Sequence, residues 1–322
     1  MMGRSAPTMT PAAETPSISV VVPVFRSAPL LPALAERLKA VLDAQGRAWE
    51  IIMVDDASPD DSYAVMQRLR AADARVRIIQ LARNHGQQHA TLCGLNYARG
   101  AEVVTIDDDL QNPPEEIAAL LARLREGHPA VIGRITDKRH GWWRNAGSRA
   151  NQYLAQSIIG KPPGLYLSSF RALSRGAVDR LVRYKGAHPH ISALLLKSVP
   201  PGAIVNVDVR HDARPLGASS YSLRKLVKTA SFLLVNHSYI PLRFMTGWGF
   251  LLSLLSLLFA AWVVWRVVFF GHAVQGWPSL AVLVAFLSGN ILMALGIVGE
   301  YLGRLVEEFS VSEQFAIHRE EV

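Results

Sequence analysis

The chain has 322 residues, enough for one sizeable folded domain and an appendage. Its formal net charge of +8 suits nucleic acid, anionic lipid and phosphorylated substrates equally, so charge alone does not select a partner. The single cysteine, Cys93, excludes an intrachain disulfide, and nothing in the sequence indicates an oxidising compartment.

The N-terminal half alternates between two kinds of segment. The first 17 residues are rich in Ser, Thr, Pro and Ala, which is typical of a disordered tail rather than a signal peptide. After them, short β-rich apolar runs alternate with segments of helical periodicity, which predicts repeated βα units on a mostly parallel sheet. The predicted strands are 18–24, 49–54, 76–81, 103–106 and 130–132, and the predicted helices are 29–42, 61–72, 87–99 and 114–126.

Unusual groups of residues lie at the carboxyl ends of the predicted strands, the edge where ligands bind in open parallel sheets. These groups are 23–26, 55–58, 83–87 and 107–109. The second group has an alternative role, because Asp and Ser before a helix commonly cap it. His85 and His89 are four residues apart without a third matching ligand nearby, so we expect them to line a site or the surface rather than bind zinc.

Three adjacent acids, Asp107 to Asp109, end the fourth predicted strand. Carboxylates gathered at one strand end repel one another, so they usually surround a divalent cation, which prefers hard oxygen ligands. Asp107, Asp109 and Gln111 share one side of an extended segment and are the predicted ligands. The alternative is a solvated acidic turn before the helix that begins near Pro114.

Two common nucleotide-binding motifs are missing from the sequence. No GxGxxG follows the first predicted strand and no GxxxxGK[ST] occurs, which argues against a dinucleotide dehydrogenase and a P-loop NTPase. A fold without a glycine cradle can still hold a diphosphate through carboxylate-bound Mg²⁺ or Mn²⁺ assisted by arginine.

The C-terminal third contains two long apolar runs, 244–270 and 278–300. Each is long enough to cross a bilayer as a helix, with a buried helical hairpin as the alternative. The loop between them lacks Lys and Arg, whereas basic residues precede the first run and Arg304 follows the second, so both flanks are predicted to be cytoplasmic. The remaining predicted regions are a tail at 1–17, a cytoplasmic domain at 18–215, a juxtamembrane amphipathic region at 216–243 and a cytoplasmic C-terminal helix or tail at 301–322.

Five segments resemble the motifs of one known family, the membrane-anchored polyprenyl-phosphate glycosyltransferases of glycosyltransferase family 2, relatives of dolichol-phosphate mannose synthase. The acidic segment 107–116 is similar to that of bacterial undecaprenyl-phosphate 4-deoxy-4-formamido-L-arabinose transferases. Segment 299–304, after the second apolar run, also resembles a family motif. The other three segments are 21–25, 54–58 and 83–87.

The resemblance implies an α/β domain of the GT-A type, with a Rossmann-like, mostly parallel sheet, followed by a two-helix transmembrane hairpin. It implies metal-dependent transfer of a sugar from a nucleotide sugar, with UDP the better guess, to undecaprenyl or another polyprenyl phosphate. The implied cofactor is Mg²⁺ or Mn²⁺, and the product would serve cell-envelope glycan or lipid A modification. The resemblance implies a multi-pass protein of the bacterial inner membrane that contacts the lipid bilayer and forms a homo-oligomer. It implies no binding of nucleic acid.

The resemblance also assigns roles to individual residues. It implies catalytic roles for Asp109, Arg171 and Arg139, and a metal site formed by Asp107, Asp109 and Gln111. The nucleotide would meet Pro23, Val24, Asp55, Gly86, Gln87 and Asp107, and the lipid phosphate would meet Arg144, Arg214, Ser219, Tyr221 and Arg224. The alternative for the arginines is attraction to the inner leaflet alone.

Three positions depart from the family pattern. Arg26 and Ser27 replace an Asn-Glu pair, Leu165 replaces an Asp, and Ser220 replaces a Lys. Loss of the acid at 165 need not abolish activity, because a phosphomonoester acceptor is already anionic near neutral pH, with a second pKa of about 6.

These departures keep a second kind of protein in view, a catalytically weak membrane-anchored scaffold derived from a glycosyltransferase. A processive polysaccharide synthase is disfavoured because the sequence has no QxxRW motif. Asp108 stands where relatives have a small residue, so we expect it to point away from the metal and to be the most dispensable of the three acids.

Overall fold

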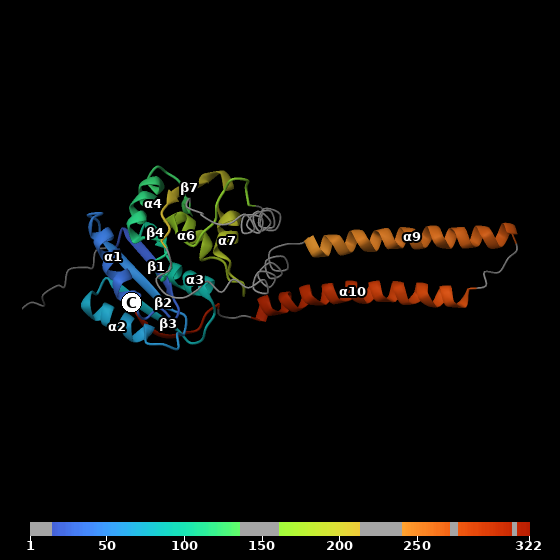
Figure 1. Cartoon of the computed structure of the whole chain (residues 1–322), viewed down its shortest axis with the longest axis horizontal. Coiled ribbons are helices and arrows are strands. Elements are labelled where there is room, and N and C mark those ends of the chain that lie inside the picture. Colours follow the sequence, from blue (N-terminus) through green and yellow to red (C-terminus); the bar gives the residue numbers. More distant parts are fainter. Residues whose placement is uncertain (1–14, 136–160, 213–239, 271–275, 311–313) are drawn as a thin grey trace, which may run out of the picture.

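The computed structural model describes residues 15–135, 161–212, 240–270, 276–310 and 314–322. Figure 1 shows a layered α/β domain at one end of the molecule. Two long helices, α9 (Ile240–Phe270) and α10 (Trp277–Ser310), extend away from it.

An eight-stranded sheet forms the centre of the described domain, in the order β7-β5-β6-β4-β1-β2-β3-β8. The four strands β4-β1-β2-β3 run parallel, and β5 and β7 run parallel to each other. Strand β6 is antiparallel between β4 and β5, and β8 is antiparallel on the edge of β3. The strands are β1 (Ile18–Val24), β2 (Trp49–Asp55), β3 (Val76–Leu81), β4 (Glu102–Thr105), β5 (Ala130–Ile135), β6 (Arg171–Ser174), β7 (Ile204–Val209) and β8 (Ile317–Glu321).

Helices cover both faces of this sheet, which explains why its central strands are continuous apolar runs. Val20 and Val22 of β1 face a core shared with α1, α2 and α4, whereas Val21 faces a second core shared with α3, α6 and α7. Gly94 of α3 allows close packing, since a Cβ there would lie 2.3 Å from Cγ1 of Val21. The helices are α1 (Leu31–Asp43), α2 (Ser62–Ala72), α3 (Gln87–Tyr97), α4 (Ile117–Leu124), α6 (Arg175–Leu181) and α7 (Ile191–Ser198), with 3-10 turns η1 (Pro114–Glu116) and η2 (Pro201–Ala203).

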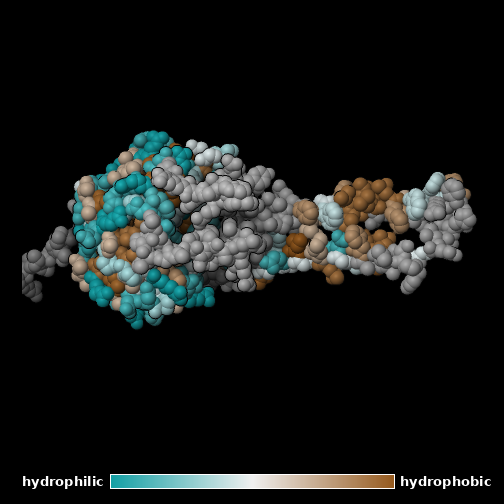
Figure 2. Space-filling model, viewed as in Figure 1, coloured by the Kyte–Doolittle hydropathy of each residue, from teal (hydrophilic) through white to brown (hydrophobic). Residues whose placement is uncertain are grey.

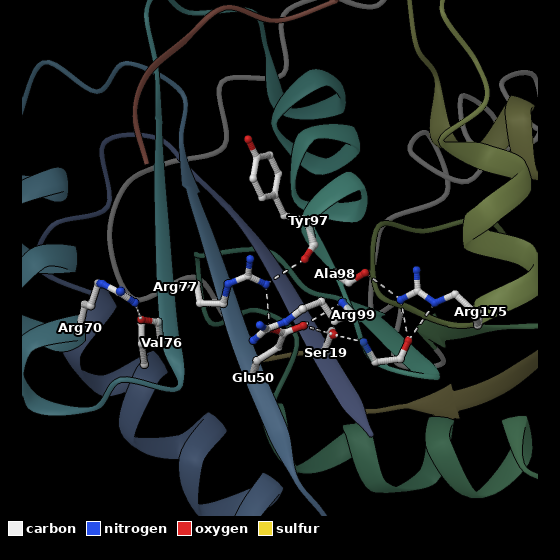
Figure 3. Close-up of polar contacts among 10 residues, drawn as sticks. Ser19, Glu50, Arg70, Val76, Arg77, Tyr97, Ala98, Arg99 and Arg175 are labelled. Carbon is white, nitrogen blue, oxygen red and sulfur yellow. Dashed lines mark hydrogen bonds and ion pairs between the residues drawn. The ribbon is translucent and has the colours of Figure 1, made fainter. Parts of the chain in front are cut away.

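A buried carboxylate, Glu50, ties the amino-terminal ends of the central strands together (Figure 3). It accepts hydrogen bonds from the Ser19 hydroxyl at 2.7 Å and from Nη1 of Arg77 at 2.8 Å. Arg99, after α3, donates to it through its backbone N–H and its guanidinium. The hydrogen bonds to Glu50 join β1, β2, β3 and the segment after α3, so we assign this buried cluster a structural role. It lies at the amino-terminal ends of the strands, and the candidate site lies at their carboxyl ends.

The two long helices lie side by side and are linked by a hydrogen bond from Nε1 of Trp248 to Oδ1 of Asn290, at 3.0 Å. Their described surfaces are apolar, as the brown region of Figure 2 shows. Within the described residues one window, Phe286–Gly303 of α10, is long and apolar enough to cross a membrane, and none of it is buried. Both predicted spans are helical, although α9 begins at Ile240 and α10 runs on to Ser310.

The predicted strands and helices of the N-terminal half all occur, with ends shifted by a few residues. In the predicted C-terminal helix or tail at 301–322, the first part is helical as the end of α10, whereas 317–321 form strand β8, which was not predicted. A polar edge strand carries no apolar run to reveal it. Most of the predicted tail at 1–17 and of the predicted amphipathic region at 216–243 lies outside the described residues.

Candidate active site

Backbone strain marks the carboxyl edge of the central strands. Within the described residues, the non-glycine positions with positive φ are Arg26 (57°), Ala57 (53°) and Leu110 (59°). One follows each of β1, β2 and β4. Such conformations cost free energy and persist where the surrounding structure enforces them, often at functional sites. The structure therefore gathers its strained loops at the edge that the sequence predicts for ligand binding.

The carboxylate of Asp107 is held from two sides. Its Oδ1 accepts a hydrogen bond from Nε2 of Gln87, the first residue of α3, at 2.6 Å. Its Oδ2 accepts from the Ser169 hydroxyl, just before β6, at 2.5 Å. Burial raises the pKa of Asp107 and nearby Asp109 raises it further, whereas Ser169, Arg171 and Gln87 act in the opposite direction. The site thus fixes the orientation of a carboxylate that lies beside a second acid.

Arg171 brings a buried positive charge to the same place. It is the first residue of β6, in register with Thr105 of β4 and Ile132 of β5, and only 3% of it is exposed. Its guanidinium makes two long hydrogen bonds, at 3.3 Å to the Ser169 carbonyl and at 3.4 Å to the Ser192 hydroxyl. Burial lowers the pKa of Arg171 to about 10, against the opposing effect of Asp107, so the side chain remains charged at neutral pH. A buried guanidinium whose hydrogen bonds to the described residues are long is well prepared to bind an anion.

Asp109 and Gln111 lie in the tight turn after β4. The backbone N–H of Gln111 donates to Oδ1 of Asp109 at 3.2 Å, and the carbonyl of Gln111 accepts from the N–H of Asp212 at 2.9 Å. Within the described residues no group of three His, Cys, Asp or Glu side chains is arranged to hold a metal ion. The predicted set is instead two carboxylates and one amide oxygen, all hard donors of the kind that Mg²⁺ and Mn²⁺ prefer.

The two acids at the carboxyl end of β2, Asp55 and Asp56, have structural partners. Asp55 is fully buried and accepts hydrogen bonds from the N–H of Ser58 at 3.1 Å and from Nε2 of Gln80 at 3.0 Å. Asp56 accepts from the backbone N–H groups of His85, at 2.7 Å, and Gly86, at 2.8 Å. Burial raises the pKa of Asp56, although these two N–H groups act against that increase.

Asp56 is a site residue that sequence reasoning missed. It fixes the turn at Gly86, whose φ of +92° favours glycine, and the next residue is Gln87, which holds Asp107. A chain of hydrogen bonds thus connects the end of β2 with the predicted metal ligand. The nearest sequence signal is its position beside Asp55 at a strand end.

The loop after β1 presents an exposed aromatic ring and a cation. Pro23 and Val24 are buried in β1, in register with Val54 and Asp55 of β2. Phe25 is 41% exposed, and the Arg26 guanidinium lies 5.2 Å from the centre of its ring.

Asp108 faces this loop and not the turn that carries Asp109. Its Oδ2 accepts hydrogen bonds from the N–H of Phe25 at 2.9 Å and from the Ser27 hydroxyl at 2.5 Å. Burial raises the pKa of Asp108 to about 6, against the opposing effect of these two donors.

Leu165, where the family pattern predicted an acid, is 8% exposed and belongs to the core shared with α3, α6 and α7. Its carbonyl accepts a hydrogen bond from Nζ of Lys161 at 2.5 Å. The other predicted site residues lie outside the described residues, namely Arg139, Arg144, Arg214, Ser219, Tyr221 and Arg224.

Comparison with known proteins agrees with this geometry. The family model "Glycosyl transferase family 2" matches residues 19–182. The undecaprenyl-phosphate 4-deoxy-4-formamido-L-arabinose transferase of Enterobacter sp. (strain 638) is 30% identical over 315 residues, which cover 97% of this chain and 95% of that protein. The glycosyltransferase YkcC of Bacillus subtilis (strain 168) is 31% identical over 292 residues, 90% of each chain.

Solved structures share the fold. Glucosyl-3-phosphoglycerate synthase from Mycobacterium tuberculosis, in complex with Mn²⁺, UDP and glucosyl-3-phosphoglycerate, has a TM-score of 0.51 at 20% identity. The match covers 68% of this chain and 78% of that one. A GT-A-like sheet with acids at its carboxyl edge, together with these relatives, defines the protein as a glycosyltransferase. The chain belongs to glycosyltransferase family 2.

Proposed function

We propose that this glycosyltransferase transfers a sugar from a UDP-sugar to undecaprenyl phosphate, or another polyprenyl phosphate, at the cytoplasmic face of the bacterial inner membrane. The observation that carries the proposal is 30% identity, along 97% of the chain, to a transferase named for undecaprenyl phosphate. An exposed apolar helix that can cross a bilayer supports a lipid acceptor, and the product would serve cell-envelope glycan or lipid A modification.

Asp107, Asp109 and Gln111 would hold Mg²⁺ or Mn²⁺. When bound, such an ion neutralises charge on the diphosphate of the donor. Gln87 and Ser169 keep Asp107 in one orientation before the donor arrives, so little reorganisation is needed on binding. The solved Mn²⁺ and UDP complex of glucosyl-3-phosphoglycerate synthase has the same fold, whereas the metal assignment here rests on the oxygen donors of this chain.

The reaction is a single displacement. A phosphate oxygen of the polyprenyl phosphate attacks the anomeric carbon, and the bond from that carbon to the diphosphate breaks, so UDP leaves with the electron pair. The acceptor is anionic near neutral pH, which is why a core leucine at 165 is compatible with activity. Arg171 stays protonated and would stabilise phosphate charge beside Asp107.

The scaffold alternative is not favoured. Asp107, Asp109 and Arg171 lie close together at one edge of the sheet, and Ser169 holds Asp107 in place. A membrane-anchored scaffold without activity would not need this arrangement. In the proposed topology α9 and α10 cross the membrane as a hairpin, with the α/β domain in the cytoplasm. The lipid phosphate would meet Arg144, Arg214, Ser219, Tyr221 and Arg224, and copies of the chain would pack through the spans.

The test is a transfer assay with the full-length protein in detergent, undecaprenyl phosphate, Mg²⁺ or Mn²⁺ and a panel of nucleotide sugars. Mass spectrometry of the lipid fraction should find one sugar added to undecaprenyl phosphate from a UDP donor. A product from a dTDP or GDP donor alone would overturn the nucleotide assignment. Sugar transfer only to a soluble acceptor, such as 3-phosphoglycerate, would overturn the lipid acceptor.

A further inference from the structure

The backbone ladder between β1 and β4 stops before the site begins. The strands pair in register from Ile18 and Glu102 to Val21 and Thr105, and the N–H of Ile106 then donates to the carbonyl of Val21. Pro23 has no N–H, so it contributes no donor to a ladder. Beyond this point the loop after β1 and the turn after β4 are no longer joined by the ladder, so other contacts must hold them together.

Asp108 supplies that connection. Its Oδ2 accepts from the Phe25 N–H and the Ser27 hydroxyl, which lie 83 and 81 residues away in the chain. Asp107 and Asp109, on either side, are the predicted metal ligands, so Asp108 joins the segment that carries them to the loop after β1. Ser27 is 7% exposed, and its hydrogen bond to Asp108 is correspondingly shielded from water.

The loop after β1 is held by side-chain oxygens at four consecutive N–H groups. Arg26, Ser27 and Ala28 donate to acceptors of the segment between β2 and α2 or of α2 itself, at 3.1, 3.1 and 3.3 Å. Phe25 donates to Asp108, which comes from the other side of the loop. The positive φ of Arg26 shows that the loop is strained, so it depends on these contacts to keep its shape.

We propose that Asp108 is a positioning residue that couples the loop carrying Phe25 and Arg26 to the turn carrying Asp109 and Gln111. It would set the distance between this loop, which follows the predicted nucleotide contacts Pro23 and Val24, and the predicted metal ligands. The proposal rests on the proposed function for the identity of the nucleotide. It replaces the expectation that Asp108 is the most dispensable of the three acids.

Loss of the two hydrogen bonds that Asp108 accepts from Phe25 and Ser27 should weaken nucleotide binding. Asp108→Ala in the full-length, detergent-solubilised protein should weaken UDP binding in calorimetry by about 10-fold or more, the effect of losing hydrogen bonds to a charged acceptor. Asp108→Asn keeps an acceptor oxygen and should recover most of the affinity. Adding Ser27→Ala to Asp108→Ala should lower UDP affinity little further, since the hydrogen bond between these two side chains is already lost.

Glu115→Gln is the matched control for Asp108→Ala, and hydrogen exchange gives a second measurement that needs no ligand. Glu115→Gln removes a nearby acid that pairs with Arg37 on the surface, and it should leave UDP affinity within about twofold. Hydrogen exchange of the ligand-free protein should become faster at residues 25–28 in Asp108→Ala and stay unchanged in Glu115→Gln.

If Asp108→Ala left hydrogen exchange at residues 25–28 unchanged, or kept UDP affinity within about twofold of the parent, the positioning role of Asp108 would be overturned. If the parent protein binds no UDP while Asp108→Ala still accelerates hydrogen exchange at 25–28, the positioning role of Asp108 is supported and the UDP-sugar donor is contradicted. The two hypotheses therefore fail by different measurements.

Discussion

Two neutral side chains decide how the Asp107 carboxylate is oriented, because Gln87 and Ser169 each hold one of its oxygens. We expect Ser169→Ala to lower turnover about 10- to 100-fold, the usual effect of losing a partner that orients a metal-binding carboxylate. Rates at several Mn²⁺ concentrations check this, since a carboxylate free to rotate also requires more metal. Ser168→Ala is the control, because among the described residues that hydroxyl donates to the carbonyls of Gly133 and Phe170 and not to Asp107. Equal rates for the Ser169 variant and the parent would contradict the orienting role.

Glu50 shows the opposite use of a buried acid, for stability rather than chemistry. Glu50→Ala should lower the free energy of unfolding by about 3–5 kcal/mol, because it leaves Arg77 buried without its carboxylate. Denaturant unfolding at pH 7 measures this. Glu126→Ala removes an exposed acid and should change stability by less than about 0.5 kcal/mol, and an equal loss in both variants would refute the assignment.

The contribution of Glu50 should also depend on pH. Burial raises its pKa, but hydrogen bonds from Ser19, Arg99 and Arg77 lower it below the ordinary value. Its stabilisation is therefore complete above the unfolded-state pKa of about 4.3 and is lost as the pH falls through the lower folded-state value. The stability difference between the parent and Glu50→Gln should shrink below about pH 4. A difference that grows on acidification would show that the sign is wrong.

At the scale of elements, the central strands could be predicted because both of their faces are buried. Val20 and Val21 point to opposite cores, so β1 is apolar from Val20 to Val24, and its one polar residue, Ser19, is paired with Glu50 of β2. Strand β7 is less regular, with the sequence IVNVDV, and β8 reads as the polar tail IHREE. An edge strand paired on one side needs few apolar residues, and its register comes from the partner strand.

The same distinction applies to the site. Asp107, Asp109 and Gln87 could be assigned to one edge because each follows a strand or begins the helix after it. The contacts of Ser169 with Asp107 and of Ser27 with Asp108 could not, since they join residues 62 and 81 positions apart. Such contacts depend on the antiparallel insertion of β6 and on where the ladder between β1 and β4 ends.

Strand β8 should stabilise the sheet that it completes. Ile317 packs against the core shared with α3, α6 and α7, and Tyr97 donates a hydrogen bond to Glu320 at 2.5 Å. Ile317→Asn should lower the free energy of unfolding by about 1–2 kcal/mol, whereas Arg319→Asn, at an exposed position of the same strand, should have little effect. Thermal unfolding of the two variants makes the comparison. Equal midpoints would show that the strand does not contribute to stability.

At the scale of the whole molecule, the proposed hairpin fixes which side of the membrane each segment faces. Burial raises the pKa of Cys93 to about 12, so the native thiol should not react with maleimides and introduced cysteines can be read against it. Gly276→Cys, before α10, should be labelled in intact spheroplasts, whereas Val322→Cys should be labelled only after permeabilisation. Labelling of both positions from the same side would contradict a two-span topology.

The central claim is that sugar transfer to a polyprenyl phosphate takes place at the turn that carries Asp107 and Asp109. The most direct measurement is formation of the undecaprenyl-phosphate sugar by the parent protein and by Asp109→Asn, with and without EDTA. We predict that the variant and chelation each lower the rate by at least about 1000-fold, about 4 kcal/mol of barrier, while the variant keeps the parent's unfolding midpoint. A folded Asp109→Asn protein that makes product at the parent rate would contradict the account.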